Sequence, residues 1–191
     1  MKGLGTALIT PFTEEGKVDF PALSQLIEHQ VAGGTDYLVI LGTTSEVPTL
    51  THQEQNAIID YVVKQVAGRM PLVLGIGGNS TAAVVERIDE LKEQLVAHFA
   101  AILSVTPYYN RPQQEGLYQH FCAVAEASFK IFIFTKSINL FPASQRCLLH
   151  CVGYVIIIFQ NGFRNFVHCP HLLCHKPLEC MFIMFSCLSY Q

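Results

Sequence analysis

The sequence predicts an α/β protein built around a parallel sheet, and two observations lead to this prediction. Short apolar segments alternate with longer amphipathic segments along most of the chain, which is the order of repeated strand–helix units. The apolar segments are also continuous, as in Leu72-Val73-Leu74, and this is typical of parallel strands that are buried on both faces. Two architectures share this order, an open doubly wound sheet and a (β/α)8 barrel.

The polar segments that follow the predicted strands favour the barrel. Gly42-Thr43-Thr44-Ser45-Glu46 follows one strand, Gly77-Gly78-Asn79-Ser80-Thr81 follows the next, and a third polar segment begins at Thr106. A barrel places its active site at the carboxyl ends of its strands, where such segments gather. A dinucleotide-binding sheet would need a Gly-x-Gly-x-x-Gly loop, and Gly75-Ile76-Gly77-Gly78 is not followed by the last glycine.

Local signals place the boundaries of the first four strand–helix units. Asp19 before Phe20-Pro21 is a helix-start signal, and Thr51 with Glu54 three residues later is a capping box. Glycines at positions 33, 34 and 68 end these two helices. The predicted strands are residues 4–10, 37–41, 72–76 and 101–105, and the predicted helices are about 20–32, 52–67, 82–95 and 113–127.

The polar segment after the second strand is the first candidate for a binding site. Its glycine allows a tight turn, and the hydroxyl and N–H groups of Thr43, Thr44 and Ser45 are able to hold a small anion. The alternative is a strand-to-helix turn in which these side chains satisfy only their own backbone. The spacing of the residues leaves both interpretations open.

The overall composition excludes some classes of function. The 191 residues carry a net charge of −3, half of them are hydrophobic and 14% are charged. There is no basic stripe that would mark a nucleic-acid-binding surface, and no apolar segment reaches the roughly 20 residues that cross a membrane. The N-terminus, Met1–Thr6, lacks the apolar core of a signal peptide, so a cytoplasmic location is expected.

The composition changes abruptly near Ser128. Fourteen of the fifteen acidic residues lie in residues 1–128, whereas six of the seven cysteines and nine of the thirteen phenylalanines follow them. The net charge is −7 for residues 1–128, with seven basic and fourteen acidic side chains, and +4 for residues 129–191, with five basic and one acidic. Residues 129–191 therefore need an interpretation of their own.

Motifs in residues 1–128 resemble a known family. Gly42-Thr43-Thr44-Ser45-Glu46 followed by Leu50-Thr51-His52 resembles the pyruvate-binding loop of class I, Schiff-base-forming lyases. Thr106-Pro107-Tyr108-Tyr109-Asn110-Arg111-Pro112, with the segment from Gln114 to Phe121, resembles the dihydrodipicolinate synthase (4-hydroxy-tetrahydrodipicolinate synthase) family more than its sialic-acid-lyase relatives. Residues 5–12 also fit the first strand of that family. The resemblance covers residues 1–128 almost without interruption.

The resemblance implies a fold and a reaction. Members of the family are α/β proteins of the (β/α)8 TIM barrel type. A lysine amine condenses with pyruvate to give a Schiff base, and the derived enamine adds to L-aspartate semialdehyde. The product is the heterocyclic precursor of lysine and diaminopimelate, and neither a metal nor an organic cofactor takes part.

The resemblance also implies roles for three side chains. It places Thr43 and Thr44 at the carboxylate of pyruvate as neutral donors. It joins Thr43 in a proton relay to Tyr109, which a neighbouring subunit contributes. A homo-oligomer, dimer or tetramer, is therefore expected for the intact family. His52 and His120 are interpreted as capping or packing residues.

The pattern of the family stops after Ser128. The Tyr-Asn-Val-Pro-x-Arg-Thr motif of the fifth strand is absent, although residues 131–134 are able to form a strand. The Schiff-base lysine should stand at the end of the sixth strand, and Lys130, Lys136 and Lys176 lack that setting. We expect only the first four to five βα units of the barrel, with open apolar strand edges, in a chain that is poorly soluble and inactive alone.

Two interpretations of residues 129–191 compete. They form either a divergent module, with a buried strand at 155–159 and a zinc site, or a non-family tail that arises from a frameshift, a missed splice or read-through. The tail is favoured, because no helix there has a clean amphipathic face and the cysteines and histidines offer no second well-spaced ligand pair. The zinc candidates are His168, Cys169, His171, Cys174, His175 and Cys180.

Two other functions stay open. Another pyruvate-dependent aldolase of the same superfamily, such as a sialic-acid or keto-deoxy-sugar lyase, would also use the loop around Thr43 and Thr44. A non-catalytic protein that uses a half-barrel as an interaction surface would account for the missing lysine. The motif around Tyr109 argues against the first alternative.

Overall fold

The computed structural model describes residues 3–128, 131–136, 155–159 and 182–183. These residues fall into two compact units. The first unit holds residues 3–75, 98–100 and 182–183, and the second holds the described residues between 76 and 97 and between 101 and 159. Each unit contains a parallel sheet together with helices, so the α/β prediction is confirmed.

The sheet of the first unit is parallel throughout its described strands. β2 (Tyr37–Ile40) lies between β1 (Leu4–Ala7) and β3 (Leu72–Gly75). β7 (Phe182–Ile183) pairs with β1 from the other side, which corrects the expectation that the first strand keeps an open edge. All four residues of β2 are buried, as its continuous apolar run predicts.

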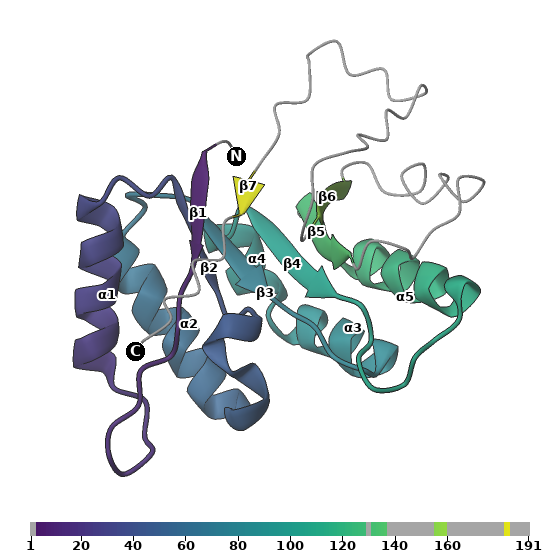
Figure 1. The fold of residues 1–191 in the computed structure, drawn as a ribbon, viewed down its shortest axis with the longest axis horizontal. Helices are drawn as coiled ribbons and strands as arrows, with labels where there is room; N and C mark the ends of the chain where they lie inside the picture. The colour runs from purple at the N-terminus through teal and green to yellow at the C-terminus, as the bar shows by residue number, and fades with distance from the viewer. Residues whose placement is uncertain (1–2, 129–130, 137–154, 160–181, 184–191) are drawn as a thin grey trace. The chain divides into compact units, whose positions relative to one another are not determined.

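Both helices of the first unit begin where the sequence signals place them. α1 (Phe20–Ala32) is capped by Asp19, whose carboxylate accepts a hydrogen bond from the N–H of Ala22 at 2.9 Å. α2 (His52–Val66) begins with the predicted capping box, in which the side chains of Thr51 and Glu54 each accept a hydrogen bond from the other residue's backbone N–H. The two helices pack against each other (Figure 1).

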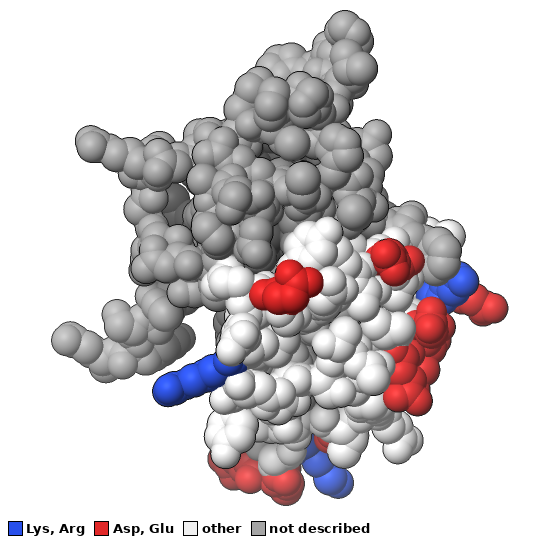
Figure 2. Space-filling model, turned by 90° about the vertical axis from the view of Figure 1, so that its right-hand side faces the viewer, with Lys and Arg blue, Asp and Glu red and all other residues white. Residues whose placement is uncertain are grey.

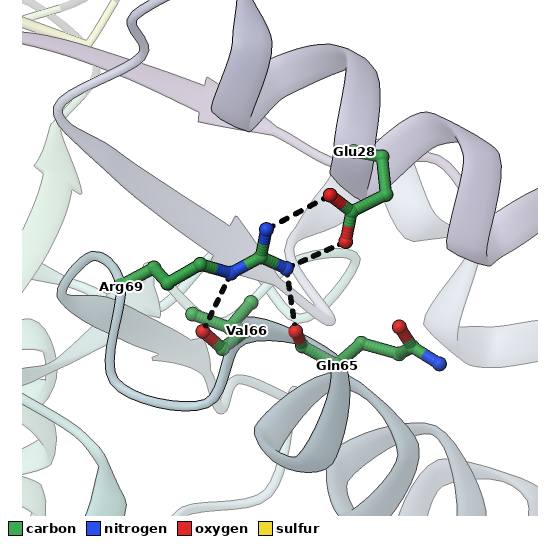
Figure 3. A network of polar contacts seen from close by, with 4 residues as sticks. All are labelled: Glu28, Gln65, Val66 and Arg69. Carbon is green, nitrogen blue, oxygen red and sulfur yellow. Dashed lines mark hydrogen bonds and ion pairs between the residues drawn. The ribbon is translucent and has the colours of Figure 1, made fainter.

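Arg69 links the end of α2 to α1 (Figure 3). Its guanidinium donates two hydrogen bonds to the carboxylate of Glu28, at 2.5 and 2.8 Å, and these bonds lower the pKa of that carboxyl group. The same side chain donates to the backbone carbonyls of Gln65 and Val66, at 2.6 and 3.1 Å. These carbonyls belong to the last turn of α2, where the helix supplies no donors of its own, so Arg69 acts as a cap.

The described strands of the second unit also form a parallel sheet, in the order β4–β5–β6. They are β4 (Ala101–Val105), β5 (Ile131–Lys136) and β6 (Val155–Phe159). The fifth strand, which the sequence indicates only weakly at 131–134, is therefore present and extends to Lys136. Residues 155–159, which only the divergent-module interpretation gives as a strand, form β6.

The helix predicted at residues 82–95 is broken in two. α3 (Thr81–Glu90) ends at Leu91, whose N–H is shared between the carbonyls of Arg87 and Asp89, and α4 (Lys92–His98) continues from there. Apolar residues recur at helical spacing on both sides of Leu91, so periodicity alone does not reveal the break. α5 (Gln114–Ala127) lies where it is predicted and packs against α3 (Figure 1).

Figure 2 shows the charges on one face of the molecule. Among the described residues on this face, acidic side chains are more prominent than basic ones, and large areas carry neither. This agrees with the acidic excess of residues 1–128. Within the described residues, no helix is long and apolar enough to cross a membrane, and no three His, Cys, Asp or Glu side chains are grouped to hold a metal ion. The zinc candidates between His168 and Cys180 lie outside the described residues.

Candidate active site

The chain leaves the carboxyl end of β2 through two successive 3-10 turns, here called the β2 loop (residues 41–50). The first turn spans Thr43–Ser45 and the second spans Val47–Thr49. Between them, Glu46 adopts a φ of 55° in the left-handed region, and its N–H donates to the carbonyl of Thr43 at 3.2 Å. These turns fix the path of the loop with its own backbone hydrogen bonds.

Thr43 and Thr44 are the accessible polar residues of the first turn. Thr43 is exposed and Thr44 is half-buried. The backbone N–H and the side-chain hydroxyl of each form no hydrogen bond with the residues that the structure describes. Four neutral donors thus lie together at the carboxyl end of a buried strand. Such a group of donors is suited to a carboxylate, whose two oxygens accept several hydrogen bonds.

A close backbone approach holds the start of the β2 loop against β3. Leu41 is buried although its φ is 51°, a conformation that is uncommon for a side chain of this size. Gly75, the last residue of β3, lies directly against it. A Cβ atom added to Gly75 would be 2.2 Å from the carbonyl oxygen of Leu41 and 2.7 Å from the N atom of Gly42. Only glycine permits this approach.

Tyr109 lies in the second unit, on the segment that follows β4, here called the β4 loop (residues 106–113). Tyr109 is 92% exposed, and its φ of 69° is in the left-handed region. The side-chain amide of Asn110 donates to the carbonyl of Asn79 at 2.8 Å and so ties the β4 loop to the loop after β3. The backbone of the β4 loop therefore presents Tyr109 away from the described core.

His120 is a buried polar residue behind the β4 loop. It is 2% exposed on α5, and its Nδ1 lies 2.8 Å from the hydroxyl of Thr81 at the start of α3. Burial lowers the pKa of His120, because the charged imidazolium loses its hydration, and the carbonyl of Val105 partly opposes this shift. His120 thus joins the end of β4 and the beginning of α3 to α5, which agrees with its interpretation as a packing residue.

We expect the lowered pKa of His120 to make the protein less stable in mild acid. The folded state binds a proton at this ring less readily than the unfolded state does, so the free energy of unfolding decreases as the pH falls below about 6.5. His120→Gln removes this contribution, and its urea-unfolding curves at pH 8 and pH 5.5 should differ less than those of the parent chain. His52→Gln, which removes an exposed histidine instead, is the comparison variant. An equal pH dependence in His120→Gln and the parent would contradict the assignment.

Two of the three predicted site residues belong to the same unit of the structure, and the third belongs to the other unit. Thr43 and Thr44 lie side by side after β2, as expected from the sequence. Tyr109 belongs to the other unit, so the relay between Thr43 and Tyr109 stays a prediction. Sequence reasoning gave no role to Thr10 or Gly75, which contact this loop. A glycine at the end of an apolar strand was the available signal for Gly75.

Parallel strands that carry short polar loops at their carboxyl ends, joined by helices, define an α/β protein of the (β/α)8 barrel class. Within this class, a family model described as the dihydrodipicolinate synthetase family matches residues 1–134. The chain belongs to this family. The resemblance seen in residues 1–128 is therefore confirmed.

Relatives and solved structures agree with this assignment. The 4-hydroxy-tetrahydrodipicolinate synthase of Parabacteroides distasonis is 56% identical over 128 residues, which is 67% of this chain and 42% of the relative. That of Flavobacterium psychrophilum is 52% identical over 165 residues, or 86% of this chain and 53% of the relative. The dihydrodipicolinate synthase structure from Aquifex aeolicus matches with a TM-score of 0.65 and 44% identity, covering 72% of this chain and 45% of that one.

The chain spans about half the length of the curated relatives it matches. The similarity to the relative from F. psychrophilum reaches past residue 128, into the segment whose composition differs.

Proposed function

We propose that the β2 loop binds the carboxylate of pyruvate, as part of a 4-hydroxy-tetrahydrodipicolinate synthase. The observation that carries this proposal is the pair Thr43 and Thr44, whose hydroxyl and N–H groups form no hydrogen bond with the described residues and lie together after β2. Hydrogen bonds from neutral groups hold an anionic substrate without a buried cation, which would itself need a partner.

In the proposed reaction, a lysine amine attacks the keto carbon of pyruvate, and a C–N double bond forms as water leaves. Loss of a proton from the methyl carbon gives an enamine, which attacks the aldehyde carbon of L-aspartate semialdehyde and forms the new C–C bond. The enzyme is a lyase of lysine and diaminopimelate biosynthesis in the cytoplasm. The chemistry requires neither a metal nor an organic cofactor.

Tyr109 is proposed to act as a proton carrier for a neighbouring subunit. A hydroxyl relay with Thr43 needs the two side chains to be within hydrogen-bond reach in the assembled enzyme. The 92% exposure of Tyr109 and its left-handed backbone support a role in contact with another molecule. An exposed aromatic ring on a strained loop contributes no stabilising contact within its own chain. The intact enzyme is accordingly proposed to be a dimer or a tetramer.

The Schiff-base lysine has no equivalent within these 191 residues. Lys136 is the last residue of β5, one strand before the strand that should carry it. We therefore propose that residues 1–128 form the N-terminal part of the barrel and that residues 129–191 are a non-family tail and not an independent domain; the family match itself continues to residue 134. This polypeptide alone is expected to bind pyruvate without turning it over.

Hydrogen exchange tests the carboxylate site directly. The full chain is incubated in deuterated buffer with and without millimolar pyruvate, and peptides that cover residues 41–50 are followed by mass spectrometry. Pyruvate should slow exchange in this segment. Thr43→Val combined with Thr44→Val should strongly reduce the protection, since two of the four donors are lost.

Thr49→Val provides the matched control for this experiment. Thr49 lies in the same loop, but its hydroxyl already donates to the carbonyl of Glu46 at 2.8 Å. The control should retain most of the pyruvate protection. Absence of protection in the parent chain, or equal protection in the double variant, would refute the proposed site.

A further inference from the structure

Ser45 fastens the β2 loop to the segment that follows β1. β1 ends at Ala7, so residues 8–10, which the sequence predicts as strand, form a connection. The hydroxyl of Ser45 donates to the carbonyl of Leu8 at 2.6 Å, and the Ser45 side chain is 2% exposed. The N–H of Leu8 donates to the carbonyl of Val39 at 2.9 Å, which anchors the connection to β2.

Thr10 makes the reciprocal contact. Its hydroxyl donates to the backbone carbonyl of Ser45 at 2.9 Å, and Thr10 is 5% exposed. Each of the two segments thus donates one buried hydroxyl hydrogen bond to a backbone carbonyl of the other. We call this pair of hydrogen bonds the Thr10–Ser45 clasp. Water cannot replace either bond at this depth, so the loss of one hydroxyl leaves a buried carbonyl without its donor.

The clasp is adjacent to the proposed substrate donors. Ser45 is the residue after Thr44 and closes the first turn, where its N–H donates to the carbonyl of Gly42 at 3.0 Å. Any displacement of Thr43 or Thr44 along the loop would therefore stretch a buried bond at Ser45. Hydrogen-bond donors must be held close to their acting position for a substrate carboxylate to gain from all of them.

We propose that Thr10 and Ser45 are positioning residues that hold the N–H and hydroxyl groups of Thr43 and Thr44 in place for the carboxylate of a 2-oxo acid. This inference rests on the proposed function of the β2 loop. Neither residue contacts the ligand itself, because both are buried and their hydroxyl groups are occupied by backbone carbonyls.

Isosteric variants separate this role from simple packing. Thr10→Val keeps the shape of the side chain and removes its donor, Ser45→Ala removes the other donor, and Thr10→Ser keeps the hydroxyl. Thr35→Val is the matched control in the same unit. Thr35 is 9% exposed, and its hydroxyl donates to the side chain of Gln30 at 2.8 Å, before β2 rather than after it.

The readout is the pyruvate concentration that gives half-maximal protection of residues 41–50 from hydrogen exchange in the full chain. Thr10→Val and Ser45→Ala should each raise this concentration roughly 5- to 10-fold, the loss expected for one buried hydrogen bond. Thr10→Ser should restore a value close to that of the parent. Thr35→Val should leave it unchanged.

Two failures are distinguishable in this experiment. If the parent chain shows no protection by pyruvate, the proposed function is wrong and the inference falls with it. If the parent chain is protected and both Thr10→Val and Ser45→Ala bind pyruvate as tightly, only the positioning role is overturned. The positioning role is also overturned if these variants speed exchange in the free protein but leave pyruvate binding unchanged, since the clasp is then only structural.

Discussion

Gly75→Ala is expected to destabilise the first unit severely. The new Cβ would meet the carbonyl carbon and oxygen of Leu41 at 2.6 and 2.2 Å, and the N atom of Gly42 at 2.7 Å. These are backbone atoms of a buried turn, so they cannot move aside as the end of a flexible side chain would. We expect the free energy of unfolding to fall by about 3 kcal/mol or more, measured by urea denaturation of the full chain.

Gly42→Ala is the control for this substitution. It adds the same methyl group to a residue of the β2 loop, but the nearest atom is a side-chain carbon of Val39 at 3.7 Å, an ordinary contact. The φ of Gly42 is −75°, which alanine adopts readily. We expect a change within about 1 kcal/mol. Equal stability of Gly75→Ala and Gly42→Ala would show that the close approach of β3 to the loop is not a constraint.

Reduction with borohydride in the presence of pyruvate should leave this polypeptide unmodified. A Schiff base forms when a lysine amine replaces the keto oxygen of pyruvate, and borohydride then reduces the C–N double bond to a stable amine. We expect none of the three lysines after residue 128 to react, because Lys136 is the last residue of β5 rather than of the sixth strand, and the sequence around Lys130 and Lys176 differs from that of the catalytic lysine. Intact mass spectrometry should therefore show one species, without a pyruvate adduct.

An intact synthase of the family serves as the positive control, because the same treatment should convert most of it to the adduct. A stoichiometric adduct on this chain would contradict the prediction, and peptide mapping would then identify the lysine. The comparison is independent of the exchange experiments on the β2 loop. A chain that binds pyruvate through Thr43 and Thr44 and forms no adduct would confirm the division between substrate binding and covalent chemistry.

The sequence alone was sufficient for features that depend on neighbouring residues. The capping box of Thr51 and Glu54 and the cap at Asp19 were predicted correctly, because each is formed within three residues. The position of Thr43 and Thr44 after a buried strand followed from the apolar run that precedes them. Such features depend on residues that are close in the sequence, so they can be predicted without knowledge of tertiary contacts.

Other features depend on contacts between distant segments, which periodicity does not report. The clasp joins Ser45 to Thr10, 35 residues away, and to Leu8, 37 residues away, and residues 8–10 look like a continued strand in the sequence. The break at Leu91 interrupts a pattern whose apolar spacing continues. The left-handed backbone conformation of Tyr109 could not be predicted from the sequence either, since tyrosine seldom adopts it.

The contacts that shape the β2 loop in the described part of the chain come from residues 8–75. Leu8 and Thr10 form hydrogen bonds with Ser45 of this loop, and Gly75 lies directly against its first residues. Backbone hydrogen bonds within the loop form its two turns. Among the described residues, no substitution after residue 75 removes a hydrogen-bond partner of this loop. A changed sequence in residues 129–191 is therefore compatible with an unchanged set of hydrogen bonds among the described residues of the β2 loop.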